Sequence, residues 1–231
     1  MSAVVLVPVK DHSKAKSRMS PLLTSEERFA VAWAMFEDLI RALLPLPYPV
    51  VIVTNSNRAS ARAEELGWRV LREAEQTSES ASVDSASQLL AREGVDAVLR
   101  LPADLPLIRP ADIVEILSPA MTAPSAALAP SWDRTGTNAL LRTPPCLFPS
   151  HFGPDSFACH AREATLRGVP LKVIENPRLA LDLDDVSDII RFLAQAAEGE
   201  TYRTLMSFNL KERLGRYAIQ CDPHMGTARD S

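Results

Sequence analysis

Short runs made almost entirely of apolar residues, many of them β-branched, recur along the first half of the chain. Residues 3–9 read AVVLVPV, residues 50–54 read VVIVT and residues 97–101 read AVLRL. A strand that is covered on both faces needs apolar side chains at nearly every position, whereas a half-exposed strand alternates apolar with polar residues. These runs therefore predict strands in the interior of a parallel sheet.

Segments with helical periodicity separate the apolar runs. In residues 24–44, apolar side chains such as Phe29 and Trp33 recur at spacings of three to four. Thr24 and Glu27 form the pattern of a capping box at the start of this segment. Strands that alternate with helices imply an α/β fold with a mostly parallel sheet and right-handed crossovers. Ligands bind such folds at the carboxyl ends of the strands, so the polar segments after strands are the places to search.

The rest of the chain continues this pattern less regularly. Further strands are predicted at residues 68–72, 126–130, 139–142 and 171–175. Further helices are predicted at residues 58–66, 83–92, 110 onward, 154–167 and 186–197, with a polar loop at 73–80. A chain of 231 residues suits one domain of this class. We expect a single domain over residues 1–215, followed by a flexible tail over residues 216–231.

Composition narrows the class of protein. The net charge is -4 and the pI is about 5.6, whereas a nucleic-acid-binding domain is usually strongly basic. The three cysteines are widely spaced and form no CxxC pair, which argues against a disulfide framework or a structural zinc site. The first residues lack the pattern of a signal peptide, and no apolar run approaches the roughly 20 residues that span a bilayer. We expect a cytoplasmic protein that binds neither nucleic acid nor membrane.

A basic segment follows the first predicted strand. Lys10, Lys14, Lys16 and Arg18 lie close together and lead toward a helix start. Lysine offers a point charge and arginine a two-pronged guanidinium for phosphate oxygens, so this segment is a candidate site for a polyphosphate. The alternative is a solvated basic loop. The chain contains neither GxGxxG nor a GxxxxGKS or GxxxxGKT motif, which disfavours a dinucleotide dehydrogenase or a P-loop kinase.

Two acidic segments follow later strands. Asp104 lies between two prolines in LPADLP, directly after the run at 97–101. Asp182, Asp184 and Asp185 lie in the segment LDLDD, where Asp182 and Asp184 share a face if the backbone is extended. Carboxylates are ligands that magnesium prefers, together with phosphate oxygens. The alternative role is that of turn and capping residues. We expect one of the three later aspartates to cap the next helix and one or two to bind metal.

Two small polar loops complete the candidates. Residues 133–138 read DRTGTN and residues 152–156 read FGPDS. Gly153 and Ser156 precede a predicted helix and can present an amide and a hydroxyl to an anion. For either loop alone, ordinary turn chemistry is the simpler interpretation. The chain has no GxSxG motif and no arrangement of a nucleophile with a base, so covalent catalysis is not expected.

Five motifs in this order resemble one family. They read VPVKDHSKAKSRMSPLLTSEER, LPADLPLIRPADI, TGTNALL, FGPDSFACHAREA and LALDLDDVSDI, and they span roughly residues 3–215. The family comprises the guanylyltransferases that begin deazaflavin coenzyme biosynthesis, within the wider MobA-like nucleotidyltransferase group. The opening motif and LPADLP are the most specific parts of the resemblance. It implies a Rossmann-like three-layer αβα sandwich of the nucleotide-diphospho-sugar transferase type.

The resemblance also implies a reaction. GMP moves from GTP to the phosphate of a small three-carbon acid, and pyrophosphate leaves. The implied acids are phosphoenolpyruvate, 2-phospho-L-lactate and 3-phospho-D-glycerate, and the implied cofactor is magnesium. We therefore expect GTP and a phosphorylated acid as partners, with a homodimer as one option for assembly.

The site residues of the family fall on three sets in this chain. Magnesium is assigned to Asp104, Asp182 and Asp184. The triphosphate is assigned to Lys10, Lys16 and Arg18, and the implied catalytic residues are Asp104, Lys16 and Arg18. The phosphorylated acid is assigned to Thr137, Gly153 and Ser156.

One segment departs from the family pattern. Family members often carry GLNAA where the nucleobase and ribose are held, whereas residues 78–84 here read SESASVD. Ser82 and Asp84 are the candidates to bind base or ribose at this place. One alternative is a nucleotidylyltransferase of the same fold for the molybdenum cofactor or a sugar phosphate, which usually carries a glycine-rich loop after the first strand. The other is a nucleotide-binding protein without catalysis, against which the retained acidic residues argue.

Overall fold

A seven-stranded sheet forms the centre of the computed structural model, which describes residues 2–10, 16–73, 78–118, 123–195 and 198–221. The strands are β1 (Ala3–Val9), β2 (Val50–Thr54), β3 (Arg69–Arg72), β4 (Ala97–Arg100), β5 (Ser125–Pro130), β6 (Thr137–Thr143) and β7 (Leu171–Val173). Their order in the sheet is β3-β2-β1-β4-β6-β5-β7. β6 pairs antiparallel with β4 and β5, and the other neighbouring strands pair in parallel. The prediction of a mostly parallel sheet is confirmed.

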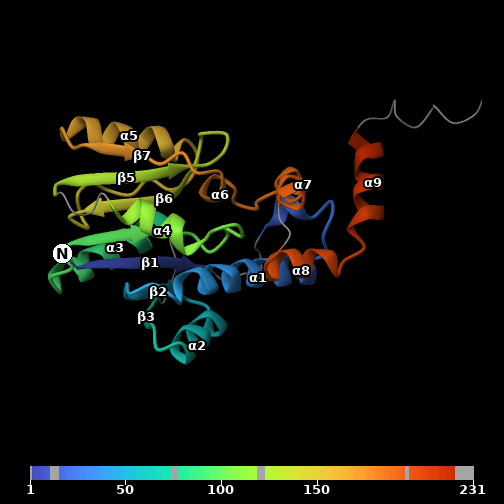
Figure 1. Ribbon diagram of the computed structural model, residues 1–231, viewed down its shortest axis with the longest axis horizontal. Coiled ribbons are helices and arrows are strands. Elements are labelled where there is room, and N and C mark those ends of the chain that lie inside the picture. The colour runs from blue at the N-terminus through green and yellow to red at the C-terminus, as the bar shows by residue number, and fades with distance from the viewer. Residues whose placement is uncertain (1, 11–15, 74–77, 119–122, 196–197, 222–231) are drawn as a thin grey trace, which may run out of the picture.

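Helices cover both faces of this sheet (Figure 1). The α-helices of the described residues are α1 (Ser25–Leu43), α2 (Asn57–Glu65), α3 (Glu79–Arg92), α4 (Pro110–Leu117), α5 (Ser156–Leu166), α6 (Pro177–Ala180), α7 (Val186–Gln195), α8 (Glu200–Met206) and α9 (Leu210–Cys221), of which α7, α8 and α9 lie beyond the sheet. Val5 and Val7 of β1 pack in a cluster with α1, α2 and α4, while Val4 and Leu6 pack in a cluster with α3. Burial of each such side chain stabilises the fold by about 1.5–3 kcal/mol. The continuous apolar run of β1 is thus explained, and the predicted three-layer αβα sandwich is confirmed.

The start of α1 has the predicted capping box. The Thr24 hydroxyl accepts a hydrogen bond from the backbone N–H of Glu27 at 3.2 Å, and the Glu27 carboxylate accepts one from the backbone N–H of Thr24 at 2.8 Å. The N-terminal half of α1 then packs with α7 and α8 in a second core cluster, which lies beyond the ends of the strands (Figure 1). This cluster anchors the acidic segment before α7, because Leu181 and Leu183 are buried in it.

Two of the differences between the structure and the sequence prediction concern the bounds of helices. The helix α3 begins at Glu79, not at 83, because the Ser78 side chain caps it by accepting from the backbone N–H of Ala81 at 3.1 Å. The boundary expected after Gly215 falls inside α9, which continues to Cys221; Leu210, Leu214 and Tyr217 pack one face of this helix against the second cluster. Residues 222–231 of the expected tail lie outside the described residues. Across the described part of the chain, no helix has both the length and the apolar character needed to cross a membrane.

Candidate functional site

A cavity of about 790 Å³ opens where β1 and β4 end. Because β6 runs antiparallel to β4, its first residues lie at this same edge. The cavity therefore collects the predicted residues from segments far apart in sequence. Those that line it are Lys10, Lys16, Arg18, Asp104, Thr137, Gly153, Ser156, Asp182 and Asp184. Lys14, the other cation of the basic segment, lies outside the described residues.

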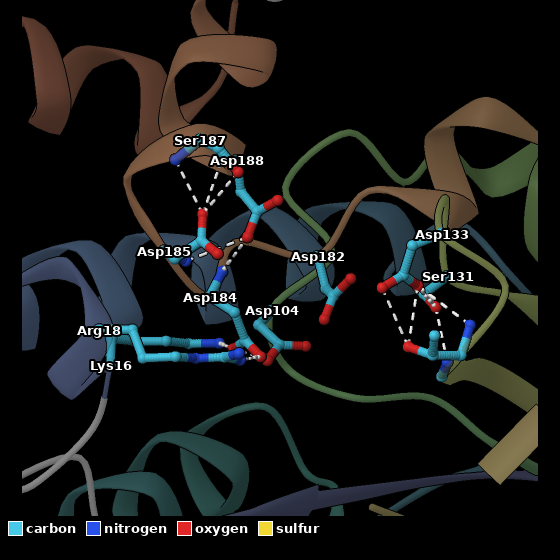
Figure 2. Close-up of polar contacts among 12 residues, drawn as sticks. Lys16, Arg18, Asp104, Ser131, Asp133, Asp182, Asp184, Asp185, Ser187 and Asp188 are labelled. Carbon is cyan, nitrogen blue, oxygen red and sulfur yellow. Dashed lines mark hydrogen bonds and ion pairs between the residues drawn. The ribbon is translucent and has the colours of Figure 1, made fainter. Parts of the chain in front are cut away.

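Lys16 joins two of the predicted metal ligands. Its ammonium lies 2.6 Å from Asp104 Oδ2 and 2.6 Å from Asp184 Oδ1. The Arg18 guanidinium also donates to Asp184, and Figure 2 shows the two basic side chains lying side by side toward these carboxylates. Burial by itself would lower the pKa of Lys16, but the charges of Asp104 and Asp184 outweigh it and raise the pKa well above its usual range. Lys16 is therefore a fixed positive charge at the base of the cavity.

Asp182 lines the same cavity, and within the described residues no ion pair joins it to a basic side chain. Its carboxylate accepts a hydrogen bond from Asn138 Nδ2 at 3.1 Å. Burial, together with the negative charges of Asp104 and Asp184, raises the pKa of Asp182 to about 7, although Lys16 opposes this shift. The cavity thus contains a carboxylate whose negative charge the protein does not fully compensate.

Hydrogen bonds at the start of α7 hold the acidic segment. Asp185 Oδ1 accepts from the backbone N–H groups of Ser187 at 2.8 Å and Asp188 at 3.2 Å, as an N-cap does. Asp188 Oδ2 in turn accepts from the backbone N–H groups of Asp184 and Asp185, each at 3.0 Å. Asp185 is therefore the capping aspartate that the sequence predicted. Asp188 was missed, although its position three residues after the cap is the spacing of a capping box.

The donor set of this wall fits magnesium. Asp104, Asp182 and Asp184 offer carboxylate oxygens to one cavity, and the Lys16 ammonium between two of them shows that a cation is stable there. Within the described residues, no three acidic, histidine or cysteine side chains lie close enough to hold a metal ion by themselves. Magnesium characteristically takes one or two carboxylates and completes its shell with water and substrate phosphates. The observed arrangement meets that requirement.

The opposite wall is built from polar turns. Asp133 Oδ1 accepts from the Ser131 hydroxyl at 2.6 Å and from the backbone N–H of Thr135 at 3.0 Å, which closes the turn between β5 and β6. Figure 2 shows this turn across the cavity from Lys16 and Arg18. Gly153 has a φ of +129°, which side-chain-bearing residues rarely adopt, although an added Cβ would meet no atom within 4 Å. Backbone conformation, and not space, therefore requires glycine at this position.

Arg100 and Glu79 line the cavity and were missed from the sequence. Arg100 is 6% exposed, donates to the carbonyl oxygens of Thr137 at 3.2 Å and Asn138 at 3.3 Å, and pairs with Glu79. The Arg100 guanidinium also lies 4.1 Å from the centroid of the Phe152 ring. A charged residue in the otherwise apolar run AVLRL was the available signal, because a buried arginine needs partners.

Ser82 and Asp84, two of the predicted nucleotide-binding residues, lie apart from the cavity that the other predicted residues line. Asp84 accepts from Arg142 Nη1 at 2.9 Å and from the backbone N–H and hydroxyl of Ser150 at 2.9 and 2.7 Å. The Ser82 hydroxyl donates to the carbonyl oxygen of Ser78 at 3.0 Å within α3. Neither side chain lines the cavity. Both residues lie within α3, where their side chains bind protein partners.

The comparisons with known proteins agree with this site. Residues 3–216 match the family model described as guanylyl transferase CofC like. The chain is 38% identical over 204 residues to phosphoenolpyruvate guanylyltransferase of Rubrobacter xylanophilus, covering 88% of this chain and 98% of the relative. It is 33% identical over 192 residues to 3-phospho-D-glycerate guanylyltransferase of Colwellia psychrerythraea, covering 82% and 90%.

The fold is also found in solved structures. A crystal structure from Desulfovibrio desulfuricans G20, of a protein provisionally named a nucleotide-diphospho-sugar transferase, superposes with a TM-score of 0.74 at 16% identity. The match covers 94% of this chain and 99% of that one. It supports the sandwich architecture alone, whereas the family match covers both walls of the cavity. The chain is therefore a nucleotidyltransferase and belongs to the CofC-like guanylyl transferase family.

Proposed function

We propose that this enzyme transfers GMP from GTP to the phosphate of a small phosphorylated three-carbon acid and releases pyrophosphate. The candidate acids are phosphoenolpyruvate, 2-phospho-L-lactate and 3-phospho-D-glycerate, and the proposed pathway is deazaflavin coenzyme biosynthesis. One observation carries the proposal. The cavity unites a wall of fixed cations and carboxylates with a wall of polar turns, in a chain that belongs to this family.

The reaction is an in-line displacement at phosphorus. An oxygen of the acid's phosphate forms a bond to the α-phosphorus of GTP, and the bond between the α-phosphorus and the bridging oxygen to the β-phosphate breaks. The attacking phosphate is already ionised near neutral pH, so the protein needs no base to activate it. Catalysis then consists mainly of positioning and of neutralising charge.

The cations of the first wall are suited to the triphosphate. Lys16 keeps its charge at all relevant pH values, because Asp104 and Asp184 stabilise the ammonium. Arg18 is largely exposed and offers a guanidinium for phosphate oxygens. We assign both to the pyrophosphate that leaves, and we assign Lys10, at the end of β1, to the same triphosphate.

Magnesium is the proposed cofactor, held by Asp104 with either Asp182 or Asp184. When bound, it would supply positive charge to phosphate oxygens around the reacting phosphorus. The uncompensated charge at Asp182 supports this assignment. On the other wall, we assign the acid to Thr137, Gly153 and the buried Ser156, all of which line the same cavity.

Pyrophosphate release tests the proposal directly. Purified protein with GTP and magnesium is supplied with each of the three acids in parallel, and the guanylylated product is identified by mass. We expect release with at least one acid, dependence on added magnesium, and much weaker release when CTP replaces GTP. If folded protein released no pyrophosphate with any of the three acids, the proposal would be contradicted. A preference for CTP would favour another nucleotidylyltransferase reaction.

A further inference from the structure

His160 is buried directly behind the wall of the cavity that carries Thr137. It lies on α5, is fully excluded from solvent, and has the Phe152 ring at 5.2 Å between centroids. Each of its ring nitrogens contacts one group. Nε2 lies 2.9 Å from the backbone nitrogen of His151, and Nδ1 lies 3.0 Å from Oγ1 of Thr137.

These two contacts determine which nitrogen carries the proton. A backbone N–H can only donate, so Nε2 must accept from His151 and must be unprotonated. Burial, followed by electrostatic interactions with Arg142, His151 and Arg100, lowers the pKa of His160 to about 3, although Asp84 opposes this shift. The ring is therefore neutral near neutral pH, and its single proton lies on Nδ1. The Nδ1–H group donates to the oxygen of the threonine hydroxyl.

The threonine hydroxyl is thereby left with a proton to donate. A hydroxyl has one proton and two lone pairs, and the ring of His160 occupies one lone pair of Thr137 Oγ1. In the described part of the chain, no protein atom accepts a hydrogen bond from this hydroxyl. Thr137 lines the cavity, together with Gly153 and Ser156. The open direction for the hydroxyl proton is therefore the cavity.

We propose that His160 is a positioning residue, whose neutral ring, protonated on Nδ1, holds the Thr137 hydroxyl as a donor toward an anionic oxygen of the phosphorylated acid. That oxygen belongs to a carboxylate or a phosphate, because both accept hydrogen bonds without donating. The inference rests on the proposed function, since the acid supplies this oxygen. A hydroxyl held as a donor favours such oxygens over groups that must themselves donate.

The protonation state is testable on the wild-type protein without any activity. Imidazole 15N labelling and long-range 1H–15N correlation distinguish the two neutral forms and the charged form of each histidine. We expect His160 to remain in the form protonated on Nδ1 from about pH 5 to about pH 8, a range in which an ordinary histidine titrates. A proton on Nε2, or titration of His160 within this range, would overturn the inference.

The effect on the acid is tested by steady-state kinetics with both substrates varied. His160→Leu removes the donor to Thr137, so we expect the KM for the acid to rise about 10- to 100-fold, as for loss of a hydrogen bond to a charged group. The KM for GTP should stay within about twofold, because Lys16, Arg18 and the acidic wall are untouched. His160→Asn retains an amide donor near the position of Nδ1 and should restore most of the acid affinity.

A double-mutant cycle separates positioning from general damage. Thr137→Val removes the hydroxyl, so adding His160→Leu to this variant should produce no further rise in the KM for the acid. His151→Asn is the matched control, because it changes the neighbouring imidazole but keeps the backbone N–H that contacts His160. Independent effects of the two substitutions, or equal rises in both KM values, would overturn the inference. Complete absence of pyrophosphate release from wild-type protein would instead contradict the proposed function, and the NMR result would stand separately.

Discussion

Low pH should destabilise the folded protein through protonation of His160. Replacing this residue should remove that part of the pH dependence of stability. In the unfolded chain the ring has its ordinary pKa of 6.5, whereas the folded protein lowers this pKa to about 3. Between these two values the unfolded state binds a proton that the folded state excludes. The free energy of unfolding therefore falls as the pH falls through this window. Above the window the ring is neutral in both states and contributes no pH dependence.

The size of the effect follows from the width of the window. Each pH unit inside it removes about 1.4 kcal/mol from the free energy of unfolding. Lowering the pH from about 7.5 to about 4.5 crosses about two units below the ordinary pKa, which corresponds to ~2.7 kcal/mol. This loss is a large fraction of the ~5–15 kcal/mol by which domains are stable. The ring is fully buried, so solvent does not screen the effect.

Urea unfolding of the wild type and His160→Asn at both pH values measures this quantity. The variant lacks the titrating ring, so its loss of stability on acidification should be smaller by about 2–3 kcal/mol. Other titrations, such as that of Asp182, occur in both proteins and cancel in the difference. The urea m-value should be unchanged, because the surface exposed on unfolding is the same. Equal losses in the two proteins would refute the assignment of a low pKa to His160.

Three further substitutions test other parts of the site. Asp104→Asn should leave the circular dichroism spectrum unchanged and lower kcat by about 10²–10³-fold in the pyrophosphate assay. Near-normal turnover would show that Asp104 has no role in the reaction. Asp84→Ala leaves the buried guanidinium of Arg142 without its carboxylate, so urea unfolding should show a loss of about 3 kcal/mol at an unchanged KM for GTP. A selective rise in the KM for GTP would show instead that Asp84 contributes to nucleotide binding. Gly153→Ala forces a side chain onto a φ of +129°, so the melting temperature should fall and the KM for the acid should rise; wild-type values for both would show that this backbone conformation is dispensable.

Much of the fold follows from local patterns. A run that is apolar at every position, as in residues 3–9, is stable only when both faces of a strand are covered, and the structure covers both faces of β1. The capping box of Thr24 and Glu27 is likewise a local arrangement, and it forms as predicted. The same holds for Asp185, whose capping contacts lie within three residues of it in sequence.

Local patterns were less informative where a side chain has distant partners. Ser82 and Asp84 occupy the place of the family's base-binding segment, yet Asp84 contacts Arg142 and Ser150, which lie 58 and 66 residues away. His160 was not among the candidates from the sequence, which shows no arrangement of a nucleophile with a base. Its contact with Thr137 spans 23 residues and depends on how α5 packs on β6.

The sequence by itself determined the layered α/β architecture, because strand burial and helix periodicity are properties of neighbouring residues. Its resemblance to the family singled out the acidic and basic residues of the first wall. Only the tertiary structure decided how these segments meet. The reversed direction of β6 places Thr137 at the edge where β1 and β4 end. Strand order and direction depend on packing between residues that are distant in sequence, so no local pattern could reveal that His160 contacts the Thr137 hydroxyl.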